Sequence, residues 1–127
     1  ANFTNLDADK AGYTTSGDGG TITQETSKST AVTLSKKCGQ ITTHNAELAA
    51  DAVASFVLTN TEIAAGDLLI LNHVSDGTIA TTGTPGAYAL NARCAAGSAT
   101  IDVTNISGGA LTENIVIGFA LVQARTD

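Results

Sequence analysis

The chain has 127 residues, a length that suits one domain, and it contains 13 glycines, no tryptophan and no methionine. Its formal net charge is −6, so it has no basic stripe to neutralise phosphates, and we expect no nucleic-acid partner. No apolar run approaches the roughly 18 residues of a membrane-spanning helix, and residues 1–10 are too polar and acidic for a signal peptide. We therefore expect a protein that is made in the cytoplasm and has no membrane partner.

Residues 1–18 predict an extended N-terminal arm. The stretch is rich in Asn, Asp, Thr and Gly, and its large apolar side chains, Phe3, Leu6 and Tyr13, stand apart from one another. Such a segment is either a disordered terminus or an arm that docks on a neighbouring surface through those three side chains.

Residues 19–127 predict a β-sandwich domain. Threonine and glycine are frequent and lysine and glutamate are scarce, a composition typical of all-β proteins. Short apolar or alternating runs recur about every ten to fifteen residues, separated by turns that contain Gly or Asn. This spacing predicts an antiparallel β-sandwich or jelly roll of about eight strands. The expected strands are residues 21–24, 31–35, 39–44, 53–59, 68–74, 87–94, 98–106 and 113–122.

The last two expected strands form the arms of a predicted closing hairpin, and they differ in pattern. Residues 98–106 alternate between apolar and polar side chains, as a half-buried strand does. Residues 113–122 are apolar on both faces, as are residues 68–74, so these strands need cover on both sides. In the final strand, one face holds Ile115, Ile117, Phe119 and Leu121, and the other holds Val116, Gly118, Ala120 and Val122.

The second apolar face of the final strand predicts an interface between subunits. A large exposed apolar sheet face marks a contact site, and the small residues Gly118 and Ala120 would keep this face flat enough for another backbone to approach. The alternative is that the N-terminal residues or long loops cover the face within the monomer; we favour the homo-oligomer. The residues assigned to the core and to this interface are Ile115, Val116, Ile117, Phe119 and Ala120.

No constellation in the sequence predicts catalysis, so we do not expect an enzyme. A nucleophile and its base must lie within hydrogen-bonding reach, and nothing local pairs a serine or cysteine with His44 or His73. Cys38 and Cys94 lack CxxC spacing and are either buried thiols or, if their strands are neighbours, a disulfide.

A metal or other cofactor is not expected either. Asn5, Asp7 and Asp9 alternate as oxygen ligands can, but the closing glutamate of a calcium loop is missing.

Two stretches of the sequence resemble a structural domain that recurs in the virion proteins of tailed phages. The first is residues 19–34, Gly-Gly-Thr-Ile-Thr-Gln-Glu-Thr-Ser-Lys-Ser-Thr-Ala-Val-Thr-Leu, followed by Cys-Gly-Gln-Ile-Thr at residues 38–42. The second is residues 95–113, Ala-Ala-Gly-Ser-Ala-Thr-Ile-Asp-Val-Thr-Asn-Ile-Ser-Gly-Gly-Ala-Leu-Thr-Glu, with the closing Ile-Val-Ile-Gly-Phe-Ala-Leu-Val. The resemblance extends over residues 19–122.

The resemblance implies an all-β module of the virion surface: a head decoration or head-fibre protein, or part of a tail fibre. Such modules are commonly trimeric, and the resemblance brings no catalytic or cofactor-binding residues. A short chain suits a decoration protein better than a long fibre, so we expect a homotrimer whose partner is the major capsid protein. We therefore expect a capsid decoration (cement) protein that binds the outer head surface and stabilises it, with Phe3, Leu6 and Tyr13 contacting the capsid.

The alternative function is a tail-fibre or head-fibre module that binds a host receptor or glycan. Residues 75–86, which contain Gly and Pro, form the candidate contact loop. Few aromatic side chains argue against sugar stacking, because Tyr13 and Tyr88 are the available tyrosines.

Overall fold

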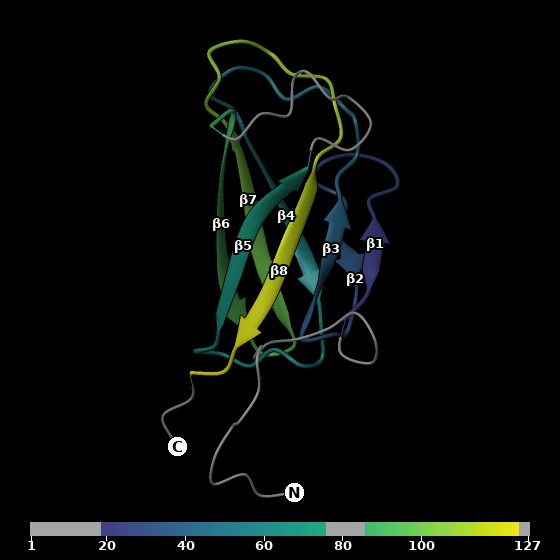
Figure 1. The fold of residues 1–127 in the computed structure, drawn as a ribbon, viewed down its shortest axis with the longest axis vertical. Helices are drawn as coiled ribbons and strands as arrows, with labels where there is room; N and C mark the ends of the chain where they lie inside the picture. Colours follow the sequence, from purple (N-terminus) through teal and green to yellow (C-terminus); the bar gives the residue numbers. More distant parts are fainter. Residues whose placement is uncertain (1–18, 76–85, 125–127) are drawn as a thin grey trace, which may run out of the picture.

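The computed structural model of the chain describes residues 19–75 and 86–124, which form two facing four-stranded sheets (Figure 1). The described residues contain eight strands and no helix, so the all-β prediction is confirmed and the arrangement is sandwich-like. The predicted arm, residues 1–18, lies outside the described residues. The strands are β1 (Thr21–Thr23), β2 (Val32–Thr33), β3 (Cys38–Thr42), β4 (Val53–Thr59), β5 (Leu68–Ser75), β6 (Tyr88–Ala95), β7 (Ser98–Asn105) and β8 (Val116–Val122).

The strands divide between a sheet with the order β1-β3-β8-β5, called sheet A here, and a sheet with the order β2-β4-β7-β6, called sheet B. Sheet A lies in front of sheet B in Figure 1. Successive strands alternate between the two sheets from β1 to β6, and β6 and β7 then form a hairpin within sheet B. The predicted closing hairpin is therefore wrong, because β7 and β8 belong to different sheets and the segment between them crosses from one sheet to the other.

Both sheets are mixed, whereas the sequence led us to expect antiparallel pairing. β1 pairs in parallel with β3, and β2 pairs in parallel with β4. The crossings explain this result: the chain leaves β1 for the other sheet, passes through β2 and returns to run beside β1 in its original direction. Parallel neighbours require such a crossover. The remaining pairs in both sheets are antiparallel.

The core lies between the sheets and follows the period-two pattern of the sequence. In β4 exposed and buried residues alternate along the whole strand. Ile41 and Ile117 from sheet A and Ile101 from sheet B are fully buried. Each predicted strand overlaps an observed one, and the largest shift of a single boundary is in β8, which begins at Val116 rather than at residue 113.

A buried lysine ties together the loops at one end of the sandwich. Lys28, in the segment between β1 and β2, is 4% exposed. Its ammonium group donates hydrogen bonds to the main-chain carbonyls of His44, of Ala46 at 3.0 Å and of Glu113 at 2.5 Å. The carboxylate of Glu113, also buried, accepts a 2.7 Å hydrogen bond from the Tyr88 hydroxyl. The cluster therefore joins the segments before β2, after β3 and before β8 to strand β6.

Candidate interaction surface

The outer face of sheet A carries an exposed apolar surface. Leu68 and Ile70 on β5 are each 55% exposed, Val74 is 46% exposed, and Val122 on β8 is 41% exposed. Single exposed apolar residues are ordinary, but these four lie on two neighbouring strands of one sheet. The outward residues of this face are Thr21, Thr23, Cys38, Gln40, Thr42, Leu68, Ile70, Asn72, Val74, Val116, Gly118, Ala120 and Val122.

The strand register places small residues in the middle of this face and larger ones on either side. Ala120 on β8 is paired with Cys38 on β3 and with Ile70 on β5. One row along, Gly118 is paired with Gln40 and Asn72. β8 therefore forms the floor of an open trough of about 300 Å³, lined by Cys38, Gly39, Gln40, Ile70, Asn72, Gly118, Phe119 and Ala120.

The face is hollowed rather than flat, which differs from the expectation based on Gly118 and Ala120. The side chains paired with Gly118 and Ala120 are larger than these two residues and form the walls on either side of them. The register of β5 also shifts between His73 and Ser75, and the side chain of Val74 lies over Gly118. A Cβ atom at Gly118 would lie 2.7 Å from Cγ2 of Val74, so this glycine makes room for the chain's own valine. The open part of the trough is therefore over Ala120.

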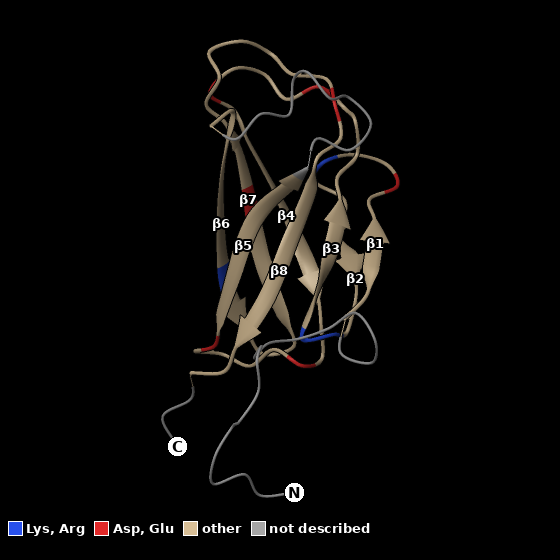
Figure 2. Ribbon diagram, in the orientation of Figure 1, with Lys and Arg blue, Asp and Glu red and all other residues tan. Residues whose placement is uncertain are grey.

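No charged side chain lies on the outer face of sheet A in the part of the chain that the structure describes. Figure 2 shows the front sheet without red or blue along β1, β3, β5 and β8, with the charges at the two ends and on the sheet behind. The outer face of sheet B differs, because Asp102 on β7 and Arg93 on β6 line a second hollow of about 280 Å³ together with Asn91 and Thr100. The outer face of sheet B therefore carries charged side chains, whereas the described outer face of sheet A carries none.

The residues assigned from sequence to the core and interface lie on β8 or directly before it, some on the inner face of sheet A and some on its outer face. Ile115, Ile117 and Phe119 are buried between the sheets. Val116 and Ala120 point outward and are partly exposed. The three arm residues Phe3, Leu6 and Tyr13 lie outside the described residues, as does almost all of the expected contact loop, of which residues 76–85 are not described.

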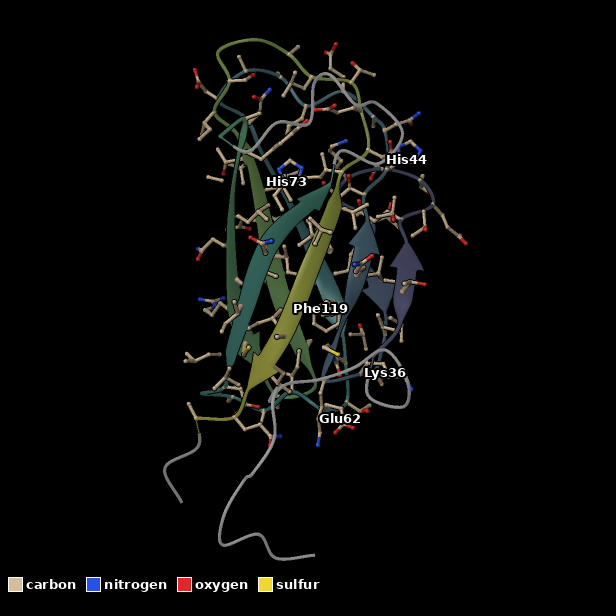
Figure 3. All side chains as sticks on the ribbon, in the orientation of Figure 1. Lys36, His44, Glu62, His73 and Phe119 are labelled. Carbon is tan, nitrogen blue, oxygen red and sulfur yellow. The ribbon has the colours of Figure 1, made fainter. Side chains whose placement is uncertain are left out.

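The histidines and cysteines do not come together in a reactive group. His44 and His73 lie near the same end of the sandwich (Figure 3). The His73 ring packs edge-on against Tyr88, with centroids 5.8 Å apart. Cys38 lies on the outer face of sheet A and Cys94 on β6 of sheet B, and both are thiols. Among the described residues, no three or more His, Cys, Asp or Glu side chains are grouped so that they could hold a metal ion.

The buried polar cluster that surrounds Lys28 was not predicted from the sequence. Lys28 lies in the polar run Ser-Lys-Ser-Thr, which looks like a solvated turn, and its carbonyl partners come from loops far along the chain. Burial lowers the pKa of the Lys28 ammonium to about 8, and the nearby Glu113 carboxylate opposes this shift. Tyr88 was expected to be available for sugar stacking, but it is buried, and burial together with its hydrogen bond to Glu113 raises its pKa.

Comparisons of the chain with protein-family models, curated proteins and solved structures found no match. Within the described residues there is also no helix long and apolar enough to cross a membrane.

Proposed function

We propose that this chain is a structural protein of a phage virion surface, and specifically a capsid decoration protein that binds the outer head and stabilises it. The observation that carries the proposal is the uncharged, apolar and hollowed outer face of sheet A, which needs a partner to cover it. The resemblance of residues 19–122 to virion domains gives that partner its class. The two facing four-stranded sheets agree with the all-β virion module that the resemblance implies, but the parallel pairs β1–β3 and β2–β4 differ from the antiparallel pairing of a jelly roll.

The mechanism would be mechanical. Copies of the chain associate, as a homotrimer by the resemblance, and bury their sheet A faces against one another. Residues 1–18 extend from each subunit to contact the major capsid protein through Phe3, Leu6 and Tyr13. Each contact is weak, but the symmetry of the capsid repeats it many times, and the repeated contacts oppose the outward pressure of packaged DNA.

The proposal is tested by the number of copies in purified virions and by binding to empty capsids. A decoration protein is present in hundreds of copies, whereas a tail or fibre module is present in a few to a few dozen. Deletion of residues 1–18 should abolish capsid binding while leaving the sandwich folded, as judged by circular dichroism. Unchanged capsid binding after this deletion would contradict the role of the arm.

A second candidate is a tail-fibre or head-fibre module that binds a host receptor or glycan, and one observation favours it. The hollow on sheet B brings the Arg93 guanidinium, the Asp102 carboxylate, the Asn91 amide and the Thr100 hydroxyl to one place. These groups suit a ligand that carries hydroxyls and a carboxylate. Low copy number in virions, together with loss of cell adsorption in Arg93→Ala, would favour this candidate over the first.

A further inference from the structure

We propose that the outer face of sheet A binds a second copy of this chain, with the ridge of one copy, Leu68 and Ile70, packed on β8 of the other so that Ile70 enters the trough over Ala120. The inference rests on the proposed function, because it specifies the partner and the contact mode of the same surface.

The shape of the trough fits a single row of aliphatic side chains. Its walls, Ile70 with Asn72 on β5 and Cys38 with Gln40 on β3, are two strand spacings apart, or roughly 10 Å. The floor at Ala120 has a side chain of one carbon atom. The ridge offers the matching shape, because Leu68 and Ile70 alternate along β5 and both project from the same face.

The charge of the molecule favours a second copy at this face. The chain carries a net charge of −6, so two copies repel each other unless they meet where neither carries a charge. The outer face of sheet A meets this condition across the described residues. The centres of protein interfaces are likewise depleted of charged side chains.

The ridge and the trough lie side by side on neighbouring strands, which makes the face self-complementary. A two-fold axis parallel to the strands, between β5 and β8, places Ile70 of each copy over Ala120 in the trough of the other, with Leu68 packed on Val122 beside it. A closed ring can use the same contact in one direction, with each ridge in the trough of the next copy. Either symmetry brings residue 70 of one copy near Cys38 of another.

Disulfide trapping tests this contact directly. Ile70→Cys, made in the full chain with Cys94→Ala, should give covalent dimers or trimers on mild oxidation, because the introduced thiol meets Cys38 of a neighbour, while Leu68 preserves the ridge. Within one chain, residues 38 and 70 lie in one row two strands apart, so their Cα atoms are roughly 10 Å apart, beyond the reach of a disulfide. Val53→Cys on sheet B is the matched control, since Val53 is 56% exposed, and it should give no such species.

Mapping the cross-linked peptides of Ile70→Cys with Cys94→Ala separates face docking from the alternative, edge pairing of two β5 strands. In the two-fold arrangement, residue 70 of one copy lies as near to residue 70 of the other copy as to Cys38, because both flank Ala120 in one row, so a 70–70 link fits both arrangements. A 70–38 link is expected in face docking alone, and 70–70 links without any 70–38 link would overturn the proposal.

Filling the trough gives a second, independent test. Ala120→Leu adds apolar area to the face, so unspecific hydrophobic association would become tighter. Ridge-into-trough docking predicts the reverse, with the dissociation constant from sedimentation equilibrium raised tenfold or more. Ile70→Asp should also raise it, and Val53→Asp should leave it unchanged. Tighter association of Ala120→Leu would overturn the proposed contact.

The outcomes also separate this inference from the proposed function. Covalent dimers without covalent trimers would support the docking and would contradict the homotrimer of the proposed function. A wild-type protein that sediments as a monomer at micromolar concentration yet binds capsids in hundreds of copies would overturn the docking and leave the decoration role intact.

Discussion

Replacement of Lys28 by methionine is expected to destabilise the fold by an amount that grows with pH. The substitution keeps the length of the aliphatic chain and removes the ammonium group. Three main-chain carbonyls, of His44, Ala46 and Glu113, then lose a charged donor. A hydrogen bond to a charged group contributes about 1.5–3 kcal/mol, so the gross loss is roughly 4.5–9 kcal/mol.

The cost of burying the charge offsets part of this loss. The pKa of Lys28 falls from 10.5 to about 8, mainly through burial, and each pKa unit corresponds to about 1.4 kcal/mol, so the ammonium form is disfavoured by about 3 kcal/mol. The net effect of Lys28→Met at pH 7 is then a decrease in the free energy of unfolding of roughly 1.5–6 kcal/mol. Lys37→Met, at a partly exposed lysine, is the matched control and should change stability by less than about 0.5 kcal/mol.

The pH dependence has a definite sign. Between about pH 8 and the ordinary lysine value of 10.5, the unfolded chain holds the Lys28 proton and the folded chain does not. The unfolding free energy of the wild type therefore rises with pH through this window, by up to about 2 kcal/mol at pH 9.5, and that of Lys28→Met lacks this rise. Tyr88 and Cys94, whose raised pKa values act in the opposite sense at alkaline pH, are present in both chains and cancel in the difference.

Urea unfolding of both chains at pH 7.0 and pH 9.5, at one protein concentration, measures the difference. The stability gap between wild type and Lys28→Met should be wider at pH 9.5. A gap that is equal or narrower would refute the reasoning, because it would mean that the three carbonyls stabilise the ammonium as well as water does.

Two further substitutions test contacts inside the sandwich. Gly39→Ala should lower the free energy of unfolding by about 1–3 kcal/mol in a urea titration, because its Cβ would lie 2.5 Å from the main-chain oxygen of Gly20. Gly109→Ala is the control, because a Cβ atom there meets no atom within 4 Å. Equal effects of the two substitutions would contradict the packing argument. Tyr88→Phe removes the 2.7 Å hydrogen bond to the buried Glu113 carboxylate and should lower the free energy of unfolding by about 1.5–3 kcal/mol. An unchanged midpoint of urea unfolding would contradict this prediction, because it would mean that the carboxylate keeps enough other partners.

The strands could be predicted from the sequence because their signal is local. The alternation in residues 53–59 and 98–106 gives the buried face directly, and Phe56 and Ile101 are buried as that pattern requires. Sheet membership could not be predicted in the same way, since pairing joins segments far apart in the chain. The short Gly-rich segment after β7 looks like a hairpin turn, but it carries the chain into the other sheet.

The candidate surface was partly predictable for the same reason. The two-sided apolar pattern of β8 predicted an exposed outer face, and Val116 and Ala120 lie on it. The trough was not predictable, because its depth depends on which side chains stand opposite Ala120, namely Cys38 and Ile70. The Lys28 cluster was hidden for a related reason: the run around it is polar, and its burial is produced by loops from elsewhere in the chain.

The position of β5 gives the strongest reason to think that sheet A is covered in the working protein. β5 is an edge strand of eight residues, and its sequence, Leu-Leu-Ile-Leu-Asn-His-Val-Ser, contains no lysine, acidic residue or proline. Soluble β proteins usually guard such an edge with a charge or a proline, because an exposed apolar edge promotes aggregation. β6, the corresponding edge of sheet B, carries an exposed Arg93. The edge of sheet B therefore carries a charge that opposes edge-to-edge pairing, whereas the β5 edge of sheet A does not. A chain can keep such an uncharged edge if the sheet is buried against a partner.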